Sequence, residues 1–366
     1  MKKSSLLSGF LLSFLSILFS LGMGEAYVRL FHRDLFDTAI LQARLEESSI
    51  KALIQPSPNP DIFFELKPNL RTTFRESVVA TGPEGYRIAG QREEPSAPPN
   101  AVRVAVLGDS TSFGWRVNYE ETYPARFRSQ MEARFGVPVD LRNYSVPGYN
   151  SKQEWHTFLE KVEPYHPDLL ILHYDHNDPQ PTGAGYAPNY IPPRYGDNFL
   201  HSALLKIVLR QMREYRNRNR RQVAGDAHTY LDGYIVSGPL YDEHLDALRA
   251  LANETARLHI PTVVVLFNAF VVADENYRQD ESYLILHKNL KDRLEGMGFY
   301  VLDLYPAYQQ KMQEEGWSDL SEFWISTDPI DGHPNPDGHR FIAETLSAFV
   351  SDQPALKQVF VKKGVQ

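Results

Sequence analysis

Short apolar runs alternate with longer segments of mixed apolar and polar residues from residue 101 onward. Such runs are typical of buried strands, and the mixed segments have the spacing of amphipathic helices. The candidate strands are residues 102–107, 139–144, 168–174, 262–267 and 299–304, and the candidate helices are residues 122–135, 151–163, 242–259, 283–296 and 337–350. This alternation predicts an α/β domain in which helices cover a parallel sheet.

The amino-terminal residues form a different pattern. Residues 6–24 are uncharged and mostly apolar, and they follow Lys2 and Lys3. A helix of this length, at about 1.5 Å per residue, approaches the thickness of a bilayer core. We therefore expect a membrane anchor that leaves the catalytic part outside the cytoplasm, on the periplasmic or extracellular face. The small residues Gly22 and Gly24 leave open a signal peptide cleaved after Gly24, which would give a secreted protein.

Residues 25–100 share neither pattern. They contain two proline clusters, at residues 56–60 and 95–99, and show little periodicity between them. Because proline clusters are typical of loops and linkers, we interpret this stretch as an irregular or small β-rich juxtamembrane module. The remaining chain then divides into a catalytic domain at 101–352, with an insertion at 180–240 at the pocket rim, and a C-terminal tail at 353–366.

The composition excludes several classes of protein. The 366 residues include 38 Lys and Arg against 46 Asp and Glu, which gives a net charge of −8. A negative chain disfavours a general nucleic-acid binder, because phosphate contacts need a positive surface. The chain has no cysteine, and this excludes thiol nucleophiles, thiolate zinc sites and disulfides.

Two polar motifs follow the first two candidate strands, where ligands gather in an open parallel sheet. In the first, Gly108 permits a sharp exit from the strand and Ser110 then begins the next segment. In the second, Gly148 lets a backbone N–H approach a substrate oxygen closely. Taken alone, each motif is equally explained by turn and cap chemistry.

Two further motifs complete the set. Asn177 follows the third candidate strand, and its side-chain amide is suited to donate to a developing oxyanion. His333 comes just before Asn335 and Pro336, which are suited to cap and begin the last helix. A nearby Asp can hold the imidazole of such a histidine in the tautomer that accepts a proton from serine.

The four motifs, which supply Ser, Gly, Asn and His in this order, resemble those of the SGNH (GDSL-like) hydrolase family, and the chain looks like its membrane-anchored bacterial type. The resemblance covers residues 101–352 in layout, and it implies a flavodoxin-like three-layer α/β/α sandwich with a five-stranded parallel sheet. It also implies that Ser110 is the nucleophile and His333 the general base. The oxyanion hole would then consist of the Ser110 N–H, the Gly148 N–H and the Asn177 side chain. No cofactor and no metal are implied.

The chain departs from the family's pattern at three positions. Thr111 stands where the GDSL label has Leu, and Asp175 replaces the Gly of the G-x-N-D block. The acid of the family commonly stands three residues before the His, where this chain has Ile330. We therefore assign the acid to Asp331, with Asp328 as the reserve.

The expected activity is ester hydrolysis through a Ser-His-Asp acyl-enzyme mechanism. The expected enzyme is a carbohydrate or lipid acyl esterase that acts on an acylated small molecule or on an envelope or exported glycan. The resemblance to membrane-anchored proteins bears on its location, with the membrane contacted through residues 6–24. Transfer of the acyl group to a sugar hydroxyl, as in an O-acyltransferase, differs only in the attacking group. The sequence leaves that choice open.

Two rival interpretations remain at this stage. A metal-dependent phosphoesterase would use hard-metal ligands from the motifs, namely His173, Asp175, His176, Asp178, Asp331, His333 and His339. A two-metal site usually needs early acidic ligands as well, and Asp109 is the one obvious candidate. The other rival is a non-catalytic envelope protein that has kept the fold, against which the intact Ser110, Asn177 and His333 argue.

Overall fold

The computed structural model describes residues 2–31, 50–90, 97–183, 235–266, 287–317, 320–325 and 333–364. The chain divides into two compact units. In the first, α1 (Lys2–Phe31) is a continuous helix that runs through both glycines of the proposed cleavage site. Within the described residues it is the one helix long and apolar enough to cross a membrane, over Leu12–Phe31. Its large apolar side chains are exposed, which is consistent with a signal sequence or an anchor.

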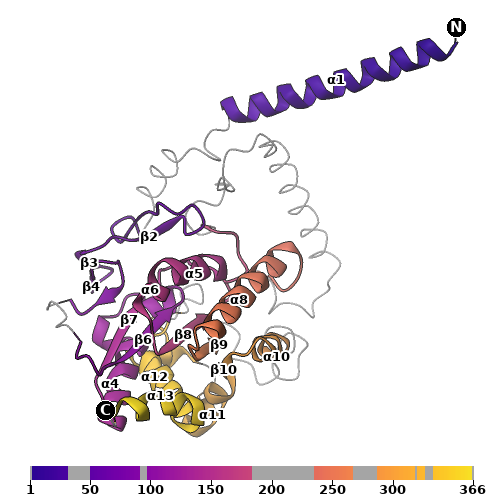
Figure 1. Ribbon diagram of the computed structural model, residues 1–366. Coiled ribbons are helices and arrows are strands. Elements are labelled where there is room, and N and C mark those ends of the chain that lie inside the picture. Colours follow the sequence, from indigo (N-terminus) through magenta and orange to yellow (C-terminus); the bar gives the residue numbers. More distant parts are fainter. Residues whose placement is uncertain are drawn as a thin grey trace. The chain divides into compact units, whose positions relative to one another are not determined.

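The second unit is built on an eight-stranded sheet with the order β10-β9-β8-β6-β7-β5-β4-β3 (Figure 1). Its five parallel strands are β6 (Val102–Leu107), β7 (Val139–Asn143), β8 (Leu169–Tyr174), β9 (Thr262–Leu266) and β10 (Tyr300–Asp303). In chain order these strands are arranged 2-1-3-4-5, as in flavodoxin-like sheets. The predicted α/β fold is therefore confirmed. The order reverses between β6 and β8, where such folds bind their ligands.

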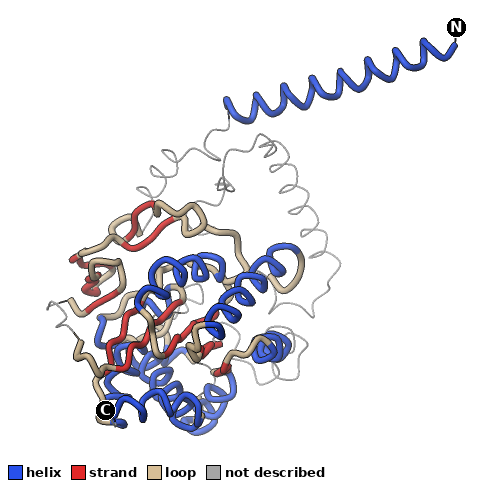
Figure 2. The backbone as a smooth tube through the Cα atoms, in the orientation of Figure 1, coloured by secondary structure: helices blue, strands red, loops and turns tan. Residues whose placement is uncertain are grey.

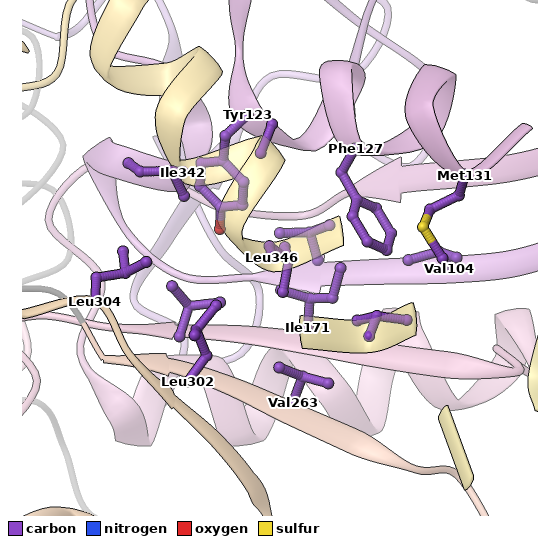
Figure 3. Close-up of a cluster of buried hydrophobic side chains, with 14 of the residues drawn as sticks. Val104, Tyr123, Phe127, Met131, Ile171, Val263, Leu302, Leu304, Ile342 and Leu346 are labelled. Carbon is purple, nitrogen blue, oxygen red and sulfur yellow. The ribbon is translucent and has the colours of Figure 1, made fainter. Parts of the chain in front are cut away.

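Helices cover both faces of the sheet (Figure 2). One layer contains α4 (Tyr123–Phe135), α11 (Tyr305–Glu315), α12 (Pro336–Asp352) and α13 (Pro354–Gly364). The other contains α5 (Ser151–Thr157), the π-helical turn η3 (Phe158–Val162), α6 (Glu163–Tyr165), α8 (Pro239–Arg257) and α10 (Asn289–Gly296). The first layer encloses the cluster of Figure 3, in which Val104 and Ile171 of the sheet face Phe127 of α4 and Leu346 of α12.

The carboxyl end of the chain differs from the expected tail. Residues 353–366 contain α13, and its Leu356 and Phe360 are fully buried. Pro354 begins this helix after α12 ends at Asp352, and the four-residue spacing of the two apolar side chains places both on one helix face. The segment is therefore part of the core of the domain.

The structure also differs from the expected boundary at residue 100. β3 (Arg71–Phe74), β4 (Ser77–Thr81) and β5 (Arg87–Ile88) extend the catalytic sheet as antiparallel strands, and β5 pairs with β7 through Arg87 and Asn143. β3 and β4 are joined at Arg75 and Glu76, whose φ angles are 45° and 72°. A tight hairpin turn normally uses Asn or Gly at such positions, so the sequence gives no turn signal here.

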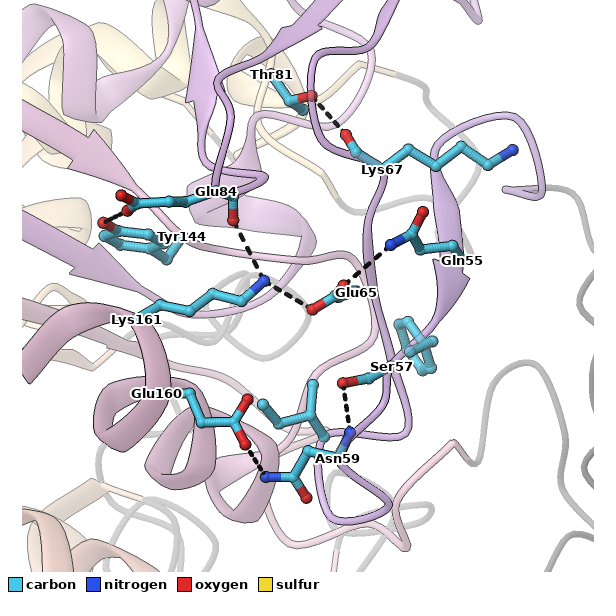
Figure 4. Close-up of polar contacts among 12 residues, drawn as sticks. Gln55, Ser57, Asn59, Glu65, Lys67, Thr81, Glu84, Tyr144, Glu160 and Lys161 are labelled. Atoms are coloured by element: carbon cyan, nitrogen blue, oxygen red, sulfur yellow. Dashed lines mark hydrogen bonds and ion pairs between the residues drawn. The ribbon is translucent and has the colours of Figure 1, made fainter. Parts of the chain in front are cut away.

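Residues upstream of β3 form a small antiparallel pair, β1 (Ile54–Pro56) and β2 (Phe64–Leu66). Polar contacts hold this pair against the catalytic domain (Figure 4). Lys161 Nζ of η3 lies 2.8 Å from Glu65 Oε2 and donates to the Glu84 carbonyl at 3.2 Å, while the Tyr144 hydroxyl donates to Glu84 Oε2 at 3.0 Å. Glu65 of β2 and Glu84, between β4 and β5, are thus joined to the parallel part of the domain.

The burial of α13 predicts a stability effect. Phe360→Ala removes a fully buried ring that stacks on Phe135 at 5.3 Å, and we expect it to lower the free energy of unfolding by about 3–5 kcal/mol. Chemical denaturation of the full-length protein in detergent measures this loss. The neighbouring Val361→Ala, at a side chain 36% exposed, is the matched control and should change stability by less than about 1 kcal/mol. Equal effects of the two changes would place α13 outside the core.

Candidate active site

Ser110 is the first residue of α3 (Ser110–Phe113), which begins directly after β6. Gly108 makes the sharp exit with φ 149°, and a Cβ on it would lie 2.1 Å from Ser112 Oγ. Only glycine fits there. Asp109 caps the short helix by accepting the Thr111 N–H at 2.9 Å, and among the described residues the Ser110 N–H takes part in no backbone hydrogen bond.

His333 lies against this serine although 223 positions separate the two residues in the chain, and its Nε2 is 2.8 Å from Ser110 Oγ. Asn335 caps α12 as expected, since its side chain accepts the N–H groups of Asp337 and Gly338 at 2.9 Å. The His333 carbonyl accepts the Ile325 N–H at 2.9 Å. The start of α12 thus fixes the backbone that carries the imidazole.

Gly148 and Asn177 lie on adjoining loops at the same edge of the sheet. The Val146 N–H donates to the Gly108 carbonyl at 3.1 Å, which ties the Gly148 loop to the turn before the serine. Gly148 has φ 81°, and among the described residues its N–H makes no backbone hydrogen bond. Asn177 Nδ2 donates one hydrogen to the Tyr149 carbonyl at 2.7 Å, and an amide nitrogen carries a second. The structure therefore brings together four of the expected residues.

The remaining expectations lie outside the described residues. Asp331 and its reserve Asp328 fall there, as does the stretch 184–234, which makes up most of the insertion expected at the pocket rim.

Four buried carboxyl groups, those of Asp109, Glu154, Asp175 and Asp178, lie near Ser110. Burial and the neighbouring Asp175 raise the pKa of Asp109 to about 6. Burial likewise raises the pKa of Asp178 to about 8, although it accepts hydrogen bonds from the Ser151 hydroxyl and the Asp175 N–H. The pKa of Glu154 is raised well above its ordinary value by burial and by Asp178. These acids are therefore protonated over part or all of the neutral range.

The fourth acid, Asp175, stays charged because it has a cationic partner. Burial alone would raise its pKa, but the contact with His176 lowers it. Burial opposes the charge of His176, but the contact with Asp175 outweighs burial and raises the pKa of His176 to about 8. The two atoms in contact, Asp175 Oδ1 and His176 Nδ1, are 2.8 Å apart. The Asp that replaces the family's Gly thus sits beside the nucleophile helix, where its Oδ2 accepts from the Thr111 hydroxyl at 3.4 Å.

Two of the histidines considered as metal ligands are bound to a tyrosine instead. The Tyr123 hydroxyl lies 3.2 Å from His173 Nδ1, and the Tyr123 N–H donates to His339 Nδ1 at 3.2 Å. Burial lowers the pKa of His173 to about 4 and that of His339 well below its ordinary value, so both are neutral. In the described part of the chain, no three His, Asp or Glu residues are grouped to hold a metal ion.

Two residues at the site were not anticipated. Trp115 stacks on His333, with 5.5 Å between ring centroids, and the fully buried Arg87 binds the loop that carries Trp115. Trp115 follows the serine by five positions, and that proximity is the one sequence signal for it. Arg87 is separated from the site in sequence and pairs with β7 through a two-residue strand, so nothing in its neighbourhood marks it.

A family model described as GDSL-like lipase/acylhydrolase matches residues 106–341, more than half of the chain. The chain belongs to this family. The match includes every candidate catalytic and oxyanion residue. This hydrolase family acts on ester bonds, which confirms the predicted class of enzyme. No curated protein sequence is significantly similar to the chain.

Solved structures similar to this GDSL-like hydrolase are distant from it in sequence. The psychrotrophic esterase EstA from Pseudoalteromonas sp. has 12% identity and a TM-score of 0.41, with 68% of this chain and 97% of that one covered. The acetylxylan esterase of Geobacillus stearothermophilus has 12% identity and a TM-score of 0.43, with 69% and 94% covered. An α/β hydrolase from the metagenome of Lake Arreo, Spain, has 16% identity and a TM-score of 0.44, with 68% and 94% covered. Likeness at this level indicates no substrate.

The buried acids predict that stability falls as pH rises. Asp178 keeps its proton in the folded state to about pH 8, and burial together with Asp178 raises the pKa of Glu154 well above its ordinary value, whereas the unfolded chain releases both protons at about pH 4. The folded state therefore binds more protons between about pH 4 and 8, and the free energy of unfolding falls across this window by up to about 1.4 kcal/mol per pH unit for each such group. Chemical denaturation at about pH 5.5 and pH 8 measures the slope.

Glu154→Gln removes one titrating group while keeping its size, so the slope should become shallower. The exposed Glu314→Gln is the control and should leave the slope unchanged. A wild-type stability that is flat or rises over this window would contradict the protonated state of the cluster.

Proposed function

We propose that the chain is a serine ester hydrolase in which Ser110 attacks the substrate carbonyl and His333 accepts the serine proton. The observation that carries the proposal is the distance of 2.8 Å between Ser110 Oγ and His333 Nε2. This is the contact between nucleophile and base that acyl transfer requires. Asp331, with Asp328 as the reserve, is proposed to orient the imidazole and to stabilise the imidazolium.

The oxyanion of the tetrahedral intermediate is proposed to be bound by three donors: the Ser110 N–H, the Gly148 N–H and the second hydrogen of Asn177 Nδ2. Two arrangements support this assignment. The Gly148 loop is tied to the turn before Ser110, and the Asn177 amide is held on the neighbouring Tyr149 carbonyl. Donors fixed in this way need no reorganisation when charge develops. Collapse of the intermediate expels the alcohol, which takes the proton from His333, and leaves an acyl-Ser110 ester. His333 then takes a proton from the attacking water and passes it to Ser110 Oγ as the carboxylic acid is released.

For the substrate we propose an acyl ester on an envelope or exported glycan. The apolar α1 supports this proposal, because an anchor or signal sequence directs the enzyme to the membrane or beyond it. An O-acyltransferase would use the same acyl-enzyme with a sugar hydroxyl as the attacking group. A screen should therefore include acetylated polysaccharides and small aryl esters, with free acid and transferred acyl group measured separately.

The nucleophile is tested by labelling the full-length protein in detergent with a serine-directed fluorophosphonate. We expect one adduct per chain, located on Ser110 by peptide mapping, because His333 activates this hydroxyl. Ser110→Ala should abolish the adduct, and His333→Ala should slow labelling strongly. Asp331→Ala should slow it more than Asp328→Ala. A folded wild type that takes up no label would overturn the proposal.

The role of Asn177 is tested separately by Asn177→Ala. Loss of one oxyanion donor should lower kcat by about 10²–10³ with a small change in KM, because the interaction forms only in the transition state. Steady-state hydrolysis of an aryl acetate measures this. Gln180→Ala, on the same loop, is a suitable control, because Gln180 contacts Asn177 and Asn150 through its backbone N–H and carbonyl, which the substitution keeps. An unchanged kcat would remove Asn177 from the oxyanion hole.

A further inference from the structure

The loop after α3 carries an indole ring onto the proposed base. The ring of Trp115 lies at 29° to that of His333, with 5.5 Å between their centroids, and the tryptophan is only 8% exposed. Its backbone N–H donates to the Ser110 carbonyl at 3.0 Å. Trp115 therefore contacts the nucleophile helix through its main chain and the base through its side chain.

A buried guanidinium holds this loop in place. Arg87 of β5 is fully buried, and it donates to the carbonyls of Phe113, Gly114 and Val117, at 2.7 Å for Gly114 and 2.6 Å for Val117. These carbonyls lie on both sides of Trp115. Burial lowers the pKa of Arg87 to about 10, so the group remains charged at neutral pH. A charged donor with three backbone acceptors fixes the path of the loop.

The hairpin of β3 and β4 reaches the same indole. The Phe74 ring meets Trp115 edge-on at 5.2 Å, and the Arg75 guanidinium lies 5.0 Å from its ring centre. The turn is joined to the loop beyond Trp115, because the Val78 N–H donates to Asn118 Oδ1 at 3.0 Å. The three strands β3, β4 and β5, which lie outside the family match, therefore contact the segment around Trp115, and Phe74 of β3 and Arg75 of the turn contact its indole.

We infer that Trp115 is a positioning residue for His333, and that Arg87 and the β3–β4 hairpin hold the Trp115 indole in place. The inference rests on the proposed role of His333. The indole face restricts rotation of the imidazole and so keeps Nε2 directed at Ser110 Oγ. When His333 takes the serine proton, the imidazolium lies against a π face, which favours the cation. Residues 71–88 are by this account part of the catalytic apparatus.

The test compares Trp115→Phe with Trp115→Leu in the full-length protein. Leucine removes the aromatic face, so we expect kcat for an aryl acetate to fall by about 10–100-fold while KM changes by less than about threefold. Fluorophosphonate labelling of Ser110 should slow in proportion. Phenylalanine restores an aromatic face and should keep kcat within about threefold of wild type. Equal losses in the two variants, or an unchanged kcat in folded Trp115→Leu, would overturn the inference.

A matched control and a readout independent of catalysis complete the test. Trp155→Leu removes a tryptophan that stacks on Phe158 at 6.1 Å, away from His333, and should leave kcat unchanged. In NMR spectra the His333 ring protons should show a ring-current shift that Trp115→Leu abolishes and Trp155→Leu does not. If wild type is unlabelled and inactive while this shift is present, the proposed function fails and the ring contact stands. If wild type is active and the shift is absent, the positioning role fails alone.

Arg87 is tested by Arg87→Lys and Arg87→Met. The lysine can reach fewer of the three carbonyls, and the methionine none, so kcat and the His333 ring-current shift should decline in that order. If Arg87→Met does not fold, Phe74→Leu provides a second test, because it removes the hairpin ring that contacts the indole and leaves Arg87 unchanged. If folded Arg87→Lys and Phe74→Leu keep the wild-type kcat and the wild-type ring-current shift, the strands do not hold the indole in place.

Discussion

A hydrogen bond of 2.8 Å joins Ser110 and His333 across 223 positions of the chain, and the catalytic part of the fold is arranged around this constraint. Each partner needs a fixed backbone, because a hydroxyl and an imidazole lose their alignment with small shifts. On the serine side, the turn at Gly108 leaves β6 at the point where the strand order reverses. On the histidine side, the cap at Asn335 fixes the start of α12, whose apolar face is buried against α4.

The polar groups packed behind the nucleophile lower stability in a way that a purely apolar packing would not. Glu154 and Asp178 have raised pKa values because burial opposes their charge, while Asp175 keeps its charge through the contact with His176. The loop that holds Asn177 is built from these groups, since Asp178 accepts the Asp175 N–H at 2.7 Å. These buried acids hold the loop that carries Asn177 in place, and they also make the free energy of unfolding depend on pH. A loss of stability of this kind is common where a functional site must be held in one geometry.

Much of this architecture is readable from the sequence, because its signals are local. Each parallel strand begins and ends within two residues of the expected bounds, since four of the five are nearly continuous apolar runs and β7 alternates buried and half-buried residues. Ser110, Gly148 and Asn177 come within five residues of the ends of β6, β7 and β8. Residues 25–100 were expected to be irregular or β-rich, but the membership of β3–β5 in the main sheet escaped prediction, because these strands are short and their turn uses Arg75 and Glu76 in place of the usual turn residues. α13 escaped it because the segment is short and terminal, and only two of its apolar side chains, those of Leu356 and Phe360, are fully buried.

The contacts that the sequence could not reveal are those made by residues far apart in the chain. Arg87 shows why: its environment is set by three carbonyls of a loop that begins 26 residues later, and no local pattern encodes that distance. Burying a guanidinium is costly, and the three loop carbonyls that accept from Nη1 and Nη2 of Arg87 reduce this cost, so the loop and β5 must be built together. The sheet provides this coupling, because β5 pairs with β7 next to β6, the strand that ends at the nucleophile turn. Removing β3–β5 would therefore leave the carbonyls around Trp115 without their donor and the indole without its edge contact. The strands that follow the amino-terminal unit thus take part in supporting the base, a role that a flexible spacer could not fulfil.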